Sequence, residues 1–392
     1  MRLIPRFLIS AICLIMMVIL MATNEDIQYT AELLSYVVGE NEPVDNPKPG
    51  EGIEGKIMEQ SAKILSLLHR REIGKELEDI LQVIGYLNIF EITGRTPAEL
   101  KPSFRQDDLV NAAGLGYINL VKLLFSLGFD LNRLNRDPFT PLIIAARNGR
   151  YEVAQFLLES GADIEKGDED GLTPLRYAVL FGHQRTADLL LSRGARVNQR
   201  DRYRWTPLLS AVANQDAPMV ELLLEYGANP ELKTTRGEFP LIEAIFYQNS
   251  DIVGLLLEGG TNPDVQDIRN NNPALFLALD QRNFRIAEML IHAGADLNSR
   301  APQLNDTPLM RAVKMEIAET VELLLEKGAE INAVDDKGWS PLFYALERGN
   351  LQITNILLKH RIDRKIVDKE GQTPLDLWSW KIDEHLQQLV SY

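Results

Sequence analysis

The chain has 392 residues, 45% of them hydrophobic, and a formal net charge of −15 at pH 7. A chain of this length can bury a large core. Its acidity argues against nucleic-acid binding, because phosphate recognition needs clusters of Lys and Arg, and favours a soluble surface or a basic partner.

The N-terminus predicts an export or anchor signal over residues 1–23. Arg2 and Arg6 precede an uncharged apolar run, Phe7–Thr23, and the next basic residue is Lys48. The run is near the minimum length for spanning a bilayer. By the positive-inside rule the N-terminus stays in the cytoplasm and the rest of the chain lies outside, in a periplasmic or extracellular space. The sequence thus predicts a single-pass membrane protein.

Cleavage of this segment is the alternative, which would give a secreted protein. Leu20 and Ala22 make a poor small-residue cleavage site, so an uncleaved anchor is favoured. The only cysteine, Cys13, lies inside the apolar run rather than just after it, which makes lipidation a weak interpretation. The exported part would therefore contain no disulfide.

Two segments separate this anchor from the remainder of the chain. Residues 24–56 include an acidic stretch dense in Pro and Gly, which is typical of an extended tether. Residues 57–104 carry apolar residues at helical spacing and predict a helical region that caps the following domain. Self-association, docking to a membrane partner, or an active role with the repeats as a spacer are the alternatives for residues 57–104.

An internal repeat follows. Leucine recurs at intervals of 33 or 34 residues, at Leu142, Leu175, Leu208, Leu241, Leu275, Leu309, Leu342 and Leu375. Most of these leucines end a Thr-Pro-Leu or Ser-Pro-Leu phrase, and a Gly-Ala phrase follows about twenty residues later, as at Gly161-Ala162 and Gly194-Ala195. Such a period indicates a stacked array in which neighbouring units bury one another's apolar faces.

Each unit is predicted to be helix, turn, helix and loop. The Thr hydroxyl can accept an unpaired amide and Pro suits the first helical position, so a helix begins at each Thr-Pro. Gly149, Gly182 and Gly349 suit the end of a short first helix, and the Gly-Ala phrase suits the end of a longer second one. Acidic, glycine-containing segments such as 168–171 have the composition of turns.

These phrases resemble the ankyrin repeat from about Arg105 to Val390. The resemblance implies an all-α solenoid of about eight to nine helix-turn-helix units over 105–392, with β-hairpin loops and a concave groove. The usual His after Thr-Pro-Leu is replaced, for example by Arg176, which implies that its link between loops and helix starts is missing.

Further departures lie in the middle repeats and at the ends. Phe239 replaces a capping Thr, and the inner-turn glycine is replaced at four positions, Gln215, Gln248, Arg282 and Glu316. Residues 201–334 are therefore expected to be the least regular stretch. Asp107 lies in the register of the capping Thr of a first repeat, and Trp380 and Tyr392 are expected to cover the last one.

No motif for chemistry is visible. The five histidines are far apart and fall at different registers, and there is no cysteine pair, phosphate loop or nucleophile elbow, so no enzyme activity, metal, cofactor or small-molecule substrate is expected. Gly114-Leu115-Gly116 is interpreted as tight helix packing. Asn305-Asp306-Thr307 is formally a glycosylation acceptor that overlaps a helix cap.

The resemblance instead implies a protein-binding surface on the loops and the exposed ends of the first helices. Large apolar side chains and Arg recur at those registers, as they do in interface hot spots. Phe181, Phe246 and Tyr247 could equally pack as core, whereas Tyr203 and Trp205 favour recognition. The candidate positions are Arg136, Phe139, Arg147, Leu172, Leu180, Phe181, Arg202, Tyr203, Trp205, Arg236, Phe246, Tyr247 and Trp339.

The sequence therefore predicts a non-catalytic interaction scaffold, membrane-tethered or exported, that binds a protein partner of unidentified nature on its concave face. The alternative is an inhibitor or immunity-type protein that neutralises a specific enzyme in the exported compartment.

Overall fold

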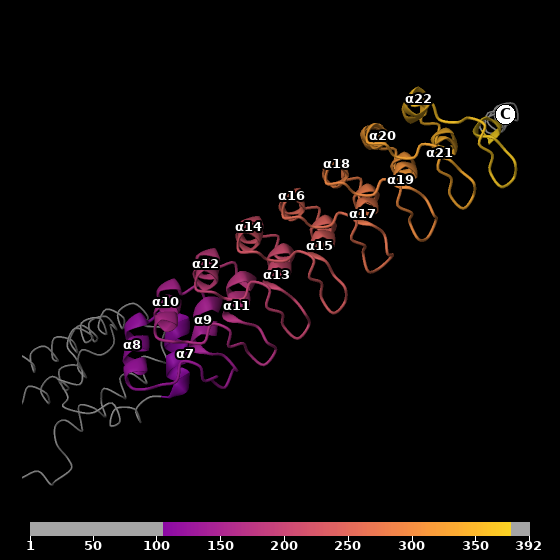
Figure 1. The fold of residues 1–392 in the computed structure, drawn as a ribbon. Coiled ribbons are helices and arrows are strands. Elements are labelled where there is room, and N and C mark those ends of the chain that lie inside the picture. Colours follow the sequence, from indigo (N-terminus) through magenta and orange to yellow (C-terminus); the bar gives the residue numbers. More distant parts are fainter. Residues whose placement is uncertain (1–104, 378–392) are drawn as a thin grey trace, which may run out of the picture. The chain divides into compact units, whose positions relative to one another are not determined.

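A computed structural model of the protein describes residues 105–377. These residues belong to two units, the first ending at Glu169 and the second beginning at Asp170, and helical pairs build both of them (Figure 1). The predicted anchor, the tether, the helical region 57–104, and Trp380 and Tyr392 lie outside the described residues. Within 105–377 every helix is too short or too polar to cross a bilayer.

The first unit contains two helical pairs among its described residues. They are α7 (Gln106–Leu115) with α8 (Ile118–Ser126), and α9 (Pro141–Arg147) with α10 (Tyr151–Glu159).

The second unit contains six pairs among its described residues, each made of a seven-residue first helix and a nine-residue second helix. They are α11 (Pro174–Leu180) with α12 (Gln184–Ser192), α13 (Pro207–Ala213) with α14 (Ala217–Glu225), α15 (Pro240–Phe246) with α16 (Ser250–Glu258), α17 (Ala274–Asp280) with α18 (Phe284–His292), α19 (Pro308–Lys314) with α20 (Ala318–Glu326), and α21 (Pro341–Glu347) with α22 (Leu351–Lys359).

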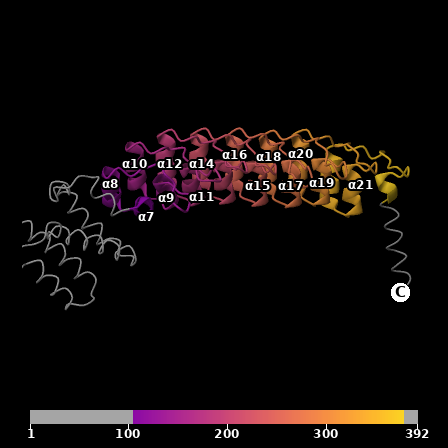
Figure 2. The same ribbon diagram turned by 90° about the horizontal axis from the view of Figure 1, so that it is seen from below.

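Within the second unit the first helices lie side by side in one row and the second helices in another (Figure 2). The apolar core lies between successive pairs, and both helices contribute to it. Leu208 on α13 is 1% exposed and Leu223 on α14 is fully buried. Burial of each such side chain stabilises the array by roughly 1.5–3 kcal/mol.

The predicted Thr-Pro helix starts are confirmed. The Thr140 hydroxyl accepts the amide of Ile143 at 3.1 Å, and Thr173, Thr206 and Thr307 cap α11, α13 and α19 in the same way. Phe239 provides no side-chain cap, as expected. Ser340 does not cap α21 either, although Pro341 follows it.

The register expected for Asp107 is wrong. Helix α7 begins at Gln106, so Asp107 lies in the first turn rather than at the cap. The cap is Arg105, whose amide donates to the Asp108 carboxylate at 2.8 Å. Acidic residues in a first turn interact favourably with the helix dipole, which explains the shift.

The helices of the middle repeats are as regular as the others, contrary to expectation. Gly149 ends α9 with φ 65°, and the residues that replace this glycine adopt the same left-handed backbone, with φ between 55° and 60°, at Gln215, Gln248, Arg282 and Glu316. Because each replacement tolerates this conformation, helices α13 to α20 keep lengths of seven and nine residues. The turn geometry is therefore retained without glycine, with some backbone strain at each site.

The loops that precede the first helices, here called fingers, extend beyond the row of first helices (Figure 1). Most fingers are closed by a backbone hydrogen bond between residues four positions apart, such as the bond from the Asp201 amide to the Trp205 carbonyl. In two fingers the bond joins residues five positions apart, from the Asp267 amide to the Asn272 carbonyl and from the Ala301 amide to the Asp306 carbonyl. The 34-residue spacings of the sequence are accommodated by these two longer fingers.

The expected β-hairpins are not formed in the described residues. Those residues contain no β-strand, and a single isolated bridge joins Gln266 and Pro273. Three pairs of adjacent fingers are linked by one backbone bond each, such as the Thr235 amide to the Tyr203 carbonyl at 3.0 Å. One bond per neighbour cannot build the ladder that a strand requires, so the fingers are turns.

The packing interpretation of Gly114 is confirmed. A Cβ at Gly114 would lie 3.1 Å from Ile144 on α9, and the Gly114 carbonyl accepts hydrogen bonds from Asn148 and Arg150. The glycine thus allows α7 to approach α9 closely, which is a structural role.

Candidate functional site

The predicted partner-binding residues of the first unit form a small surface by themselves. Arg136 has an 85% exposed side chain and lies 3.8 Å from Asp107. The Arg147 guanidinium lies over the ring of Phe139, 5.5 Å from its centroid, and both residues are half-buried. This contact holds the end of α9 against its own finger.

In the second unit, the first helices α11 and α15 end in exposed apolar pairs. Leu180 and Phe181 are 38% and 46% exposed, and Phe246 and Tyr247 are 51% and 41% exposed. The two pairs occupy the same register, at the last residue of the helix and the residue after it. None of Phe181, Phe246 and Tyr247 is buried as core, so the packing alternative is not supported. Their role in binding stays a prediction.

The finger before α13 presents Tyr203, which is 51% exposed. Arg202 lies over the Tyr203 ring at 5.0 Å and donates to its hydroxyl at 3.1 Å. Arg202 also pairs with Asp170 of the preceding finger at 2.6 Å. Arg202 therefore holds the Tyr203 ring in place, and about half of Tyr203 remains exposed to solvent.

Trp205 in the same finger is half-buried and contacts Arg176 of α11, whose guanidinium lies 5.6 Å from the ring centroid. Arg176 is itself buried, donates to the Thr206 carbonyl at 3.2 Å, and lies 3.7 Å from the Asp201 carboxylate. Burial lowers the pKa of Arg176, and Asp201 partly offsets this effect. The expectation that the link between loops and helix starts is missing is wrong here, because Arg176 makes that link.

Arg269 is a candidate that sequence reasoning missed. It lies in the longer finger before α17 and its guanidinium is 4.9 Å from the centroid of the Phe246 ring. The Phe246 and Tyr247 rings meet edge to face at 5.8 Å. A finger and the preceding first helix therefore combine into one cation–aromatic surface. In the sequence, this longer finger is indicated only by the 34-residue spacing from Leu241 to Leu275.

Leu172 and Trp339 are half-buried, and Arg236 is exposed at the finger before α15. Trp339 stacks on Phe343 with ring centroids 5.4 Å apart, and Lys337 lies over its ring. Trp339 therefore packs its own finger against α21.

We call the exposed residues of the fingers and first-helix ends in the second unit the finger-side face. It comprises Leu180, Phe181, Arg202, Tyr203, Arg236, Phe246, Tyr247 and Arg269. It is an apolar and cationic surface rather than a catalytic arrangement.

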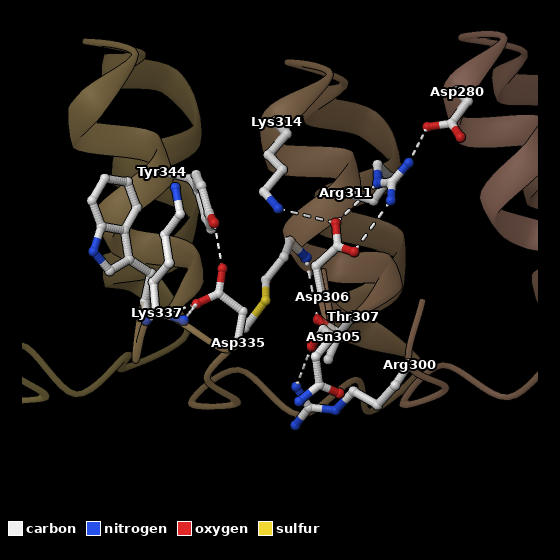
Figure 3. Close-up of polar contacts among 12 residues, drawn as sticks. Asp280, Arg300, Asn305, Asp306, Thr307, Arg311, Lys314, Asp335, Lys337 and Tyr344 are labelled. Carbon is white, nitrogen blue, oxygen red and sulfur yellow. Dashed lines mark hydrogen bonds and ion pairs between the residues drawn. The ribbon is translucent and has the colours of Figure 1, made fainter. Parts of the chain in front are cut away.

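A buried ionic centre, also missed from the sequence, supports the fingers further along (Figure 3). The Asp306 side chain is fully buried and binds Arg311 at 2.9 Å and Lys314 at 3.1 Å. Arg311 also binds Asp280 on α17 at 2.6 Å. Burial alone would raise the pKa of Asp306, but hydrogen bonds and attraction from Arg311 and Lys314 outweigh it and lower that pKa.

The next finger is anchored in a related way. The Tyr344 hydroxyl of α21 donates to the Asp335 carboxylate (Figure 3), and burial together with this bond raises the pKa of Tyr344. The other Asp335 oxygen accepts the amides of Lys337 and Trp339 at 2.9 and 3.0 Å. These contacts fix the fingers rather than expose reactive groups.

Neither unit offers a metal centre in its described part, since no three His, Cys, Asp or Glu side chains within 105–377 are grouped closely enough to hold an ion. Asn305 of the formal glycosylation motif is exposed, and its side-chain amide donates to Asp336 at 3.0 Å.

Comparison with known proteins gives a consistent family. The family model of ankyrin repeats in three copies matches residues 109–201, 198–267, 241–335 and 309–392. The chain is 36% identical to mouse Rabankyrin-5 over 112 residues, which are 26% of this chain and 10% of that protein. It is 34% identical to an ankyrin repeat protein of fowlpox virus over 115 residues, 28% of this chain and 34% of the viral protein.

A further similar protein is the mouse 2-5A-dependent ribonuclease, with 42% identity over 71 residues, 18% of this chain and 10% of that protein. The chain thus spans between a tenth and about a third of the length of these relatives. Among solved structures, the ankyrin repeat domain of Bcl-3 is 27% identical with a TM-score of 0.47, covering 53% of this chain and 95% of that one.

Proposed function

Because this chain belongs to the ankyrin-repeat family, whose members are generally non-enzymatic protein-interaction scaffolds, we propose that it binds a partner protein through the finger-side face. The observation that carries the proposal is the pair of exposed apolar dipeptides, Leu180-Phe181 and Phe246-Tyr247, at matching registers of α11 and α15. Surface aromatics beside arginine are the composition of interface hot spots.

The free energy available from burying aromatic side chains favours the same face. An aromatic anchor buried by a partner can contribute about 2 kcal/mol or more, and Phe181, Tyr203 and Phe246 are each about half exposed. Arg202 and Arg269 already lie over Tyr203 and Phe246, so ordering these side chains on binding loses little conformational entropy. A preformed surface of this kind suits recognition of a folded or extended protein segment.

We further propose that the scaffold is held at a membrane by residues 1–23, with the repeats on the outer side. The support is sequence alone: Arg2 and Arg6 precede the uncharged run and no basic residue follows it before Lys48. Secretion after cleavage is the alternative. Protease digestion of the repeats in cells with a permeabilised outer barrier but an intact cytoplasmic membrane would support this orientation, and protection until that membrane is opened would contradict it.

Site-specific photo-crosslinking tests the binding face. A benzophenone amino acid is placed at Tyr203 or Phe246 in the full chain, and at Phe284 as a matched control, because Phe284 is a 38% exposed aromatic on the second-helix row. Discrete adducts at Tyr203 and Phe246 but not at Phe284 are expected. Equal adducts at all three positions, or adducts at Phe284 alone, would remove this face from consideration.

The identity of the crosslinked protein then separates two roles. A stable one-to-one complex with a hydrolase or toxin that loses activity would favour the inhibitor or immunity-type protein. Adducts with several proteins of one assembly would favour the scaffold.

A further inference from the structure

We infer that the tips of four successive fingers bind an acidic segment of a partner protein that also carries apolar side chains. We call these tips, residues 200–205, 233–238, 266–272 and 300–306, the basic finger row. The inference rests on the proposed function and specifies the chemistry of the partner.

The basic finger row has a charge opposite to that of the whole chain. Its four segments contain seven Lys or Arg residues and four Asp or Glu residues, whereas the fingers at 334–339 and 367–372 each contain two acidic residues and one basic residue. Six of the seven cations are exposed, and Arg200 is half-buried. The positive charge therefore lies at the surface of the row.

Three of the four acidic residues in the row have buried side chains that are already bound: the Asp201 side chain is 5% exposed, and Asp267 and Asp306 are buried. Asp201 accepts the amides of Tyr203 and Trp205 at 2.8 and 2.9 Å, and Asp267 accepts those of Arg269 and Asn270 at 2.7 Å. Asp306 binds two cations of α19. Asp201 and Asp267 hold the finger backbone from within, and Asp306 is paired with its two cations, so little negative charge reaches the tips.

Apolar side chains alternate with these cations. Tyr203, Ile268 and Leu304 are 51%, 48% and 50% exposed, and each belongs to a different finger. Scattered single apolar residues need no explanation, but these three lie on fingers that are fixed to their neighbours. Gln303 donates to Asn270 at 3.3 Å, and the Ile268 side chain lies against Gly237.

Arg204 adds a cation to the row at a position where other fingers carry glycine. The corresponding position in four other fingers is glycine with φ between 78° and 88°, as at Gly171 and Gly237, whereas Arg204 adopts φ 61°. A long side chain in this left-handed region is unfavourable relative to glycine. Arg282 and Arg361 adopt the same left-handed backbone outside the row, so Arg204 supports the inference through its exposed charge and not through its strain.

The chemistry favours a short acidic protein segment over a nucleic acid. Neighbouring helical pairs are about 8–10 Å apart, so four fingers span roughly 25–30 Å, which about nine extended residues would cover. A longer polyanion would continue past Leu304 onto the exposed Asp336. The chain as a whole carries a charge of −15, which would repel an extended phosphate backbone.

The test is a selection. A library of random 12-residue peptides displayed on phage is panned on the full chain in detergent, and on the variant Arg204→Glu, Arg236→Glu, Arg269→Glu. The matched control is Arg361→Glu, because Arg361 is exposed and has a similar φ of 62° but lies outside the row. Circular dichroism confirms that each variant is folded, and selected peptides are measured by fluorescence anisotropy at 50 and 300 mM salt.

The wild type and Arg361→Glu are expected to enrich acidic peptides that contain aromatic or aliphatic residues. Their affinity should fall about tenfold or more in the triple variant and should weaken with salt. Enrichment of neutral or basic peptides, no enrichment, or unchanged affinity in the triple variant would overturn the inference.

Two outcomes separate this inference from its premise. Binding of labelled single-stranded DNA that is lost in the triple variant would assign the row to phosphate and overturn the inference. Peptides that depend on Phe246 but not on the three arginines would overturn the acidic partner and leave the finger-side face as a protein-binding surface.

Discussion

The substitution Asp306→Ala tests whether the ionic centre of Figure 3 holds the array together. Asp306 is fully buried and binds both Arg311 and Lys314, so its removal leaves two half-buried cations without this carboxylate. Breaking a buried pair in this way costs about 3–5 kcal/mol. Because Arg311 keeps its 2.6 Å contact with Asp280, we expect a loss near the lower end, about 3 kcal/mol.

Urea unfolding followed by two probes measures this loss. Circular dichroism reports the helices of the whole array. Fluorescence reports Trp339 on the adjacent finger when Trp205, Trp378 and Trp380 are replaced by Phe in both the reference chain and the variants. Repeat arrays are stabilised by contacts between neighbours, so the Trp339 transition should move to lower urea before the helical one. The control is Asp251→Ala, whose partner Arg285 is 68% exposed, and which should change stability by less than about 1 kcal/mol. Similar small losses in both variants would refute the assignment of a structural ion pair.

Three further predictions follow from the described residues. Gln248→Gly should raise the free energy of unfolding by about 0.5–1 kcal/mol in urea titrations, since Gln248 has φ 55° and glycine relieves that strain; a loss of stability would contradict the strain. The folded-state pKa of Asp306 is lowered, so the contribution of its carboxylate to stability is present above about pH 4 and is lost as pH falls. The difference in free energy of unfolding between wild type and Asp306→Ala should therefore shrink at pH 3, and a difference that stays constant would contradict this prediction. Burial and Glu238 raise the pKa of Glu243, with Arg269 partly offsetting them, so the wild type loses stability as pH rises through that pKa. The stability of Glu243→Gln relative to wild type should therefore increase from pH 4 to pH 7. Thermal melts in which the difference between the two proteins is the same at pH 4 and pH 7 would exclude this effect.

The sequence predicted the repeat unit well because the relevant chemistry is local. The Thr140 hydroxyl caps the amide of Ile143 three residues on, Pro141 occupies the first helical position, and Gly149 needs only its own backbone freedom. Such features depend on residues three or four positions apart, which a single sequence displays directly. The expectation of irregular middle repeats was wrong for the helices, because Gln215 adopts a left-handed backbone that its local preference disfavours. The two longer fingers, closed from Asp267 to Asn272 and from Ala301 to Asp306, do lie in this stretch.

The site was predicted less completely because its key contacts join different repeats. Arg176 reaches Thr206, and Arg311 reaches Asp280, each about thirty residues away in the chain. Arg269 became visible as a candidate only when its finger was placed against Phe246. The repeat register indicates which positions are exposed, but side chains that meet across two repeats are known only once the repeats are stacked.

Net charge illustrates the same limit for partner chemistry. The charge of −15 favoured a basic partner, yet the side chains of Asp201, Asp267 and Asp306 are buried. There they accept hydrogen bonds from amides and cations of their own repeats. An acidic residue used in this way adds to the formal charge without contributing an accessible carboxylate to the surface. A repeat protein can therefore be acidic in sequence and present a row of cations at its fingers, and partner chemistry should be inferred from exposed charges finger by finger rather than from the total.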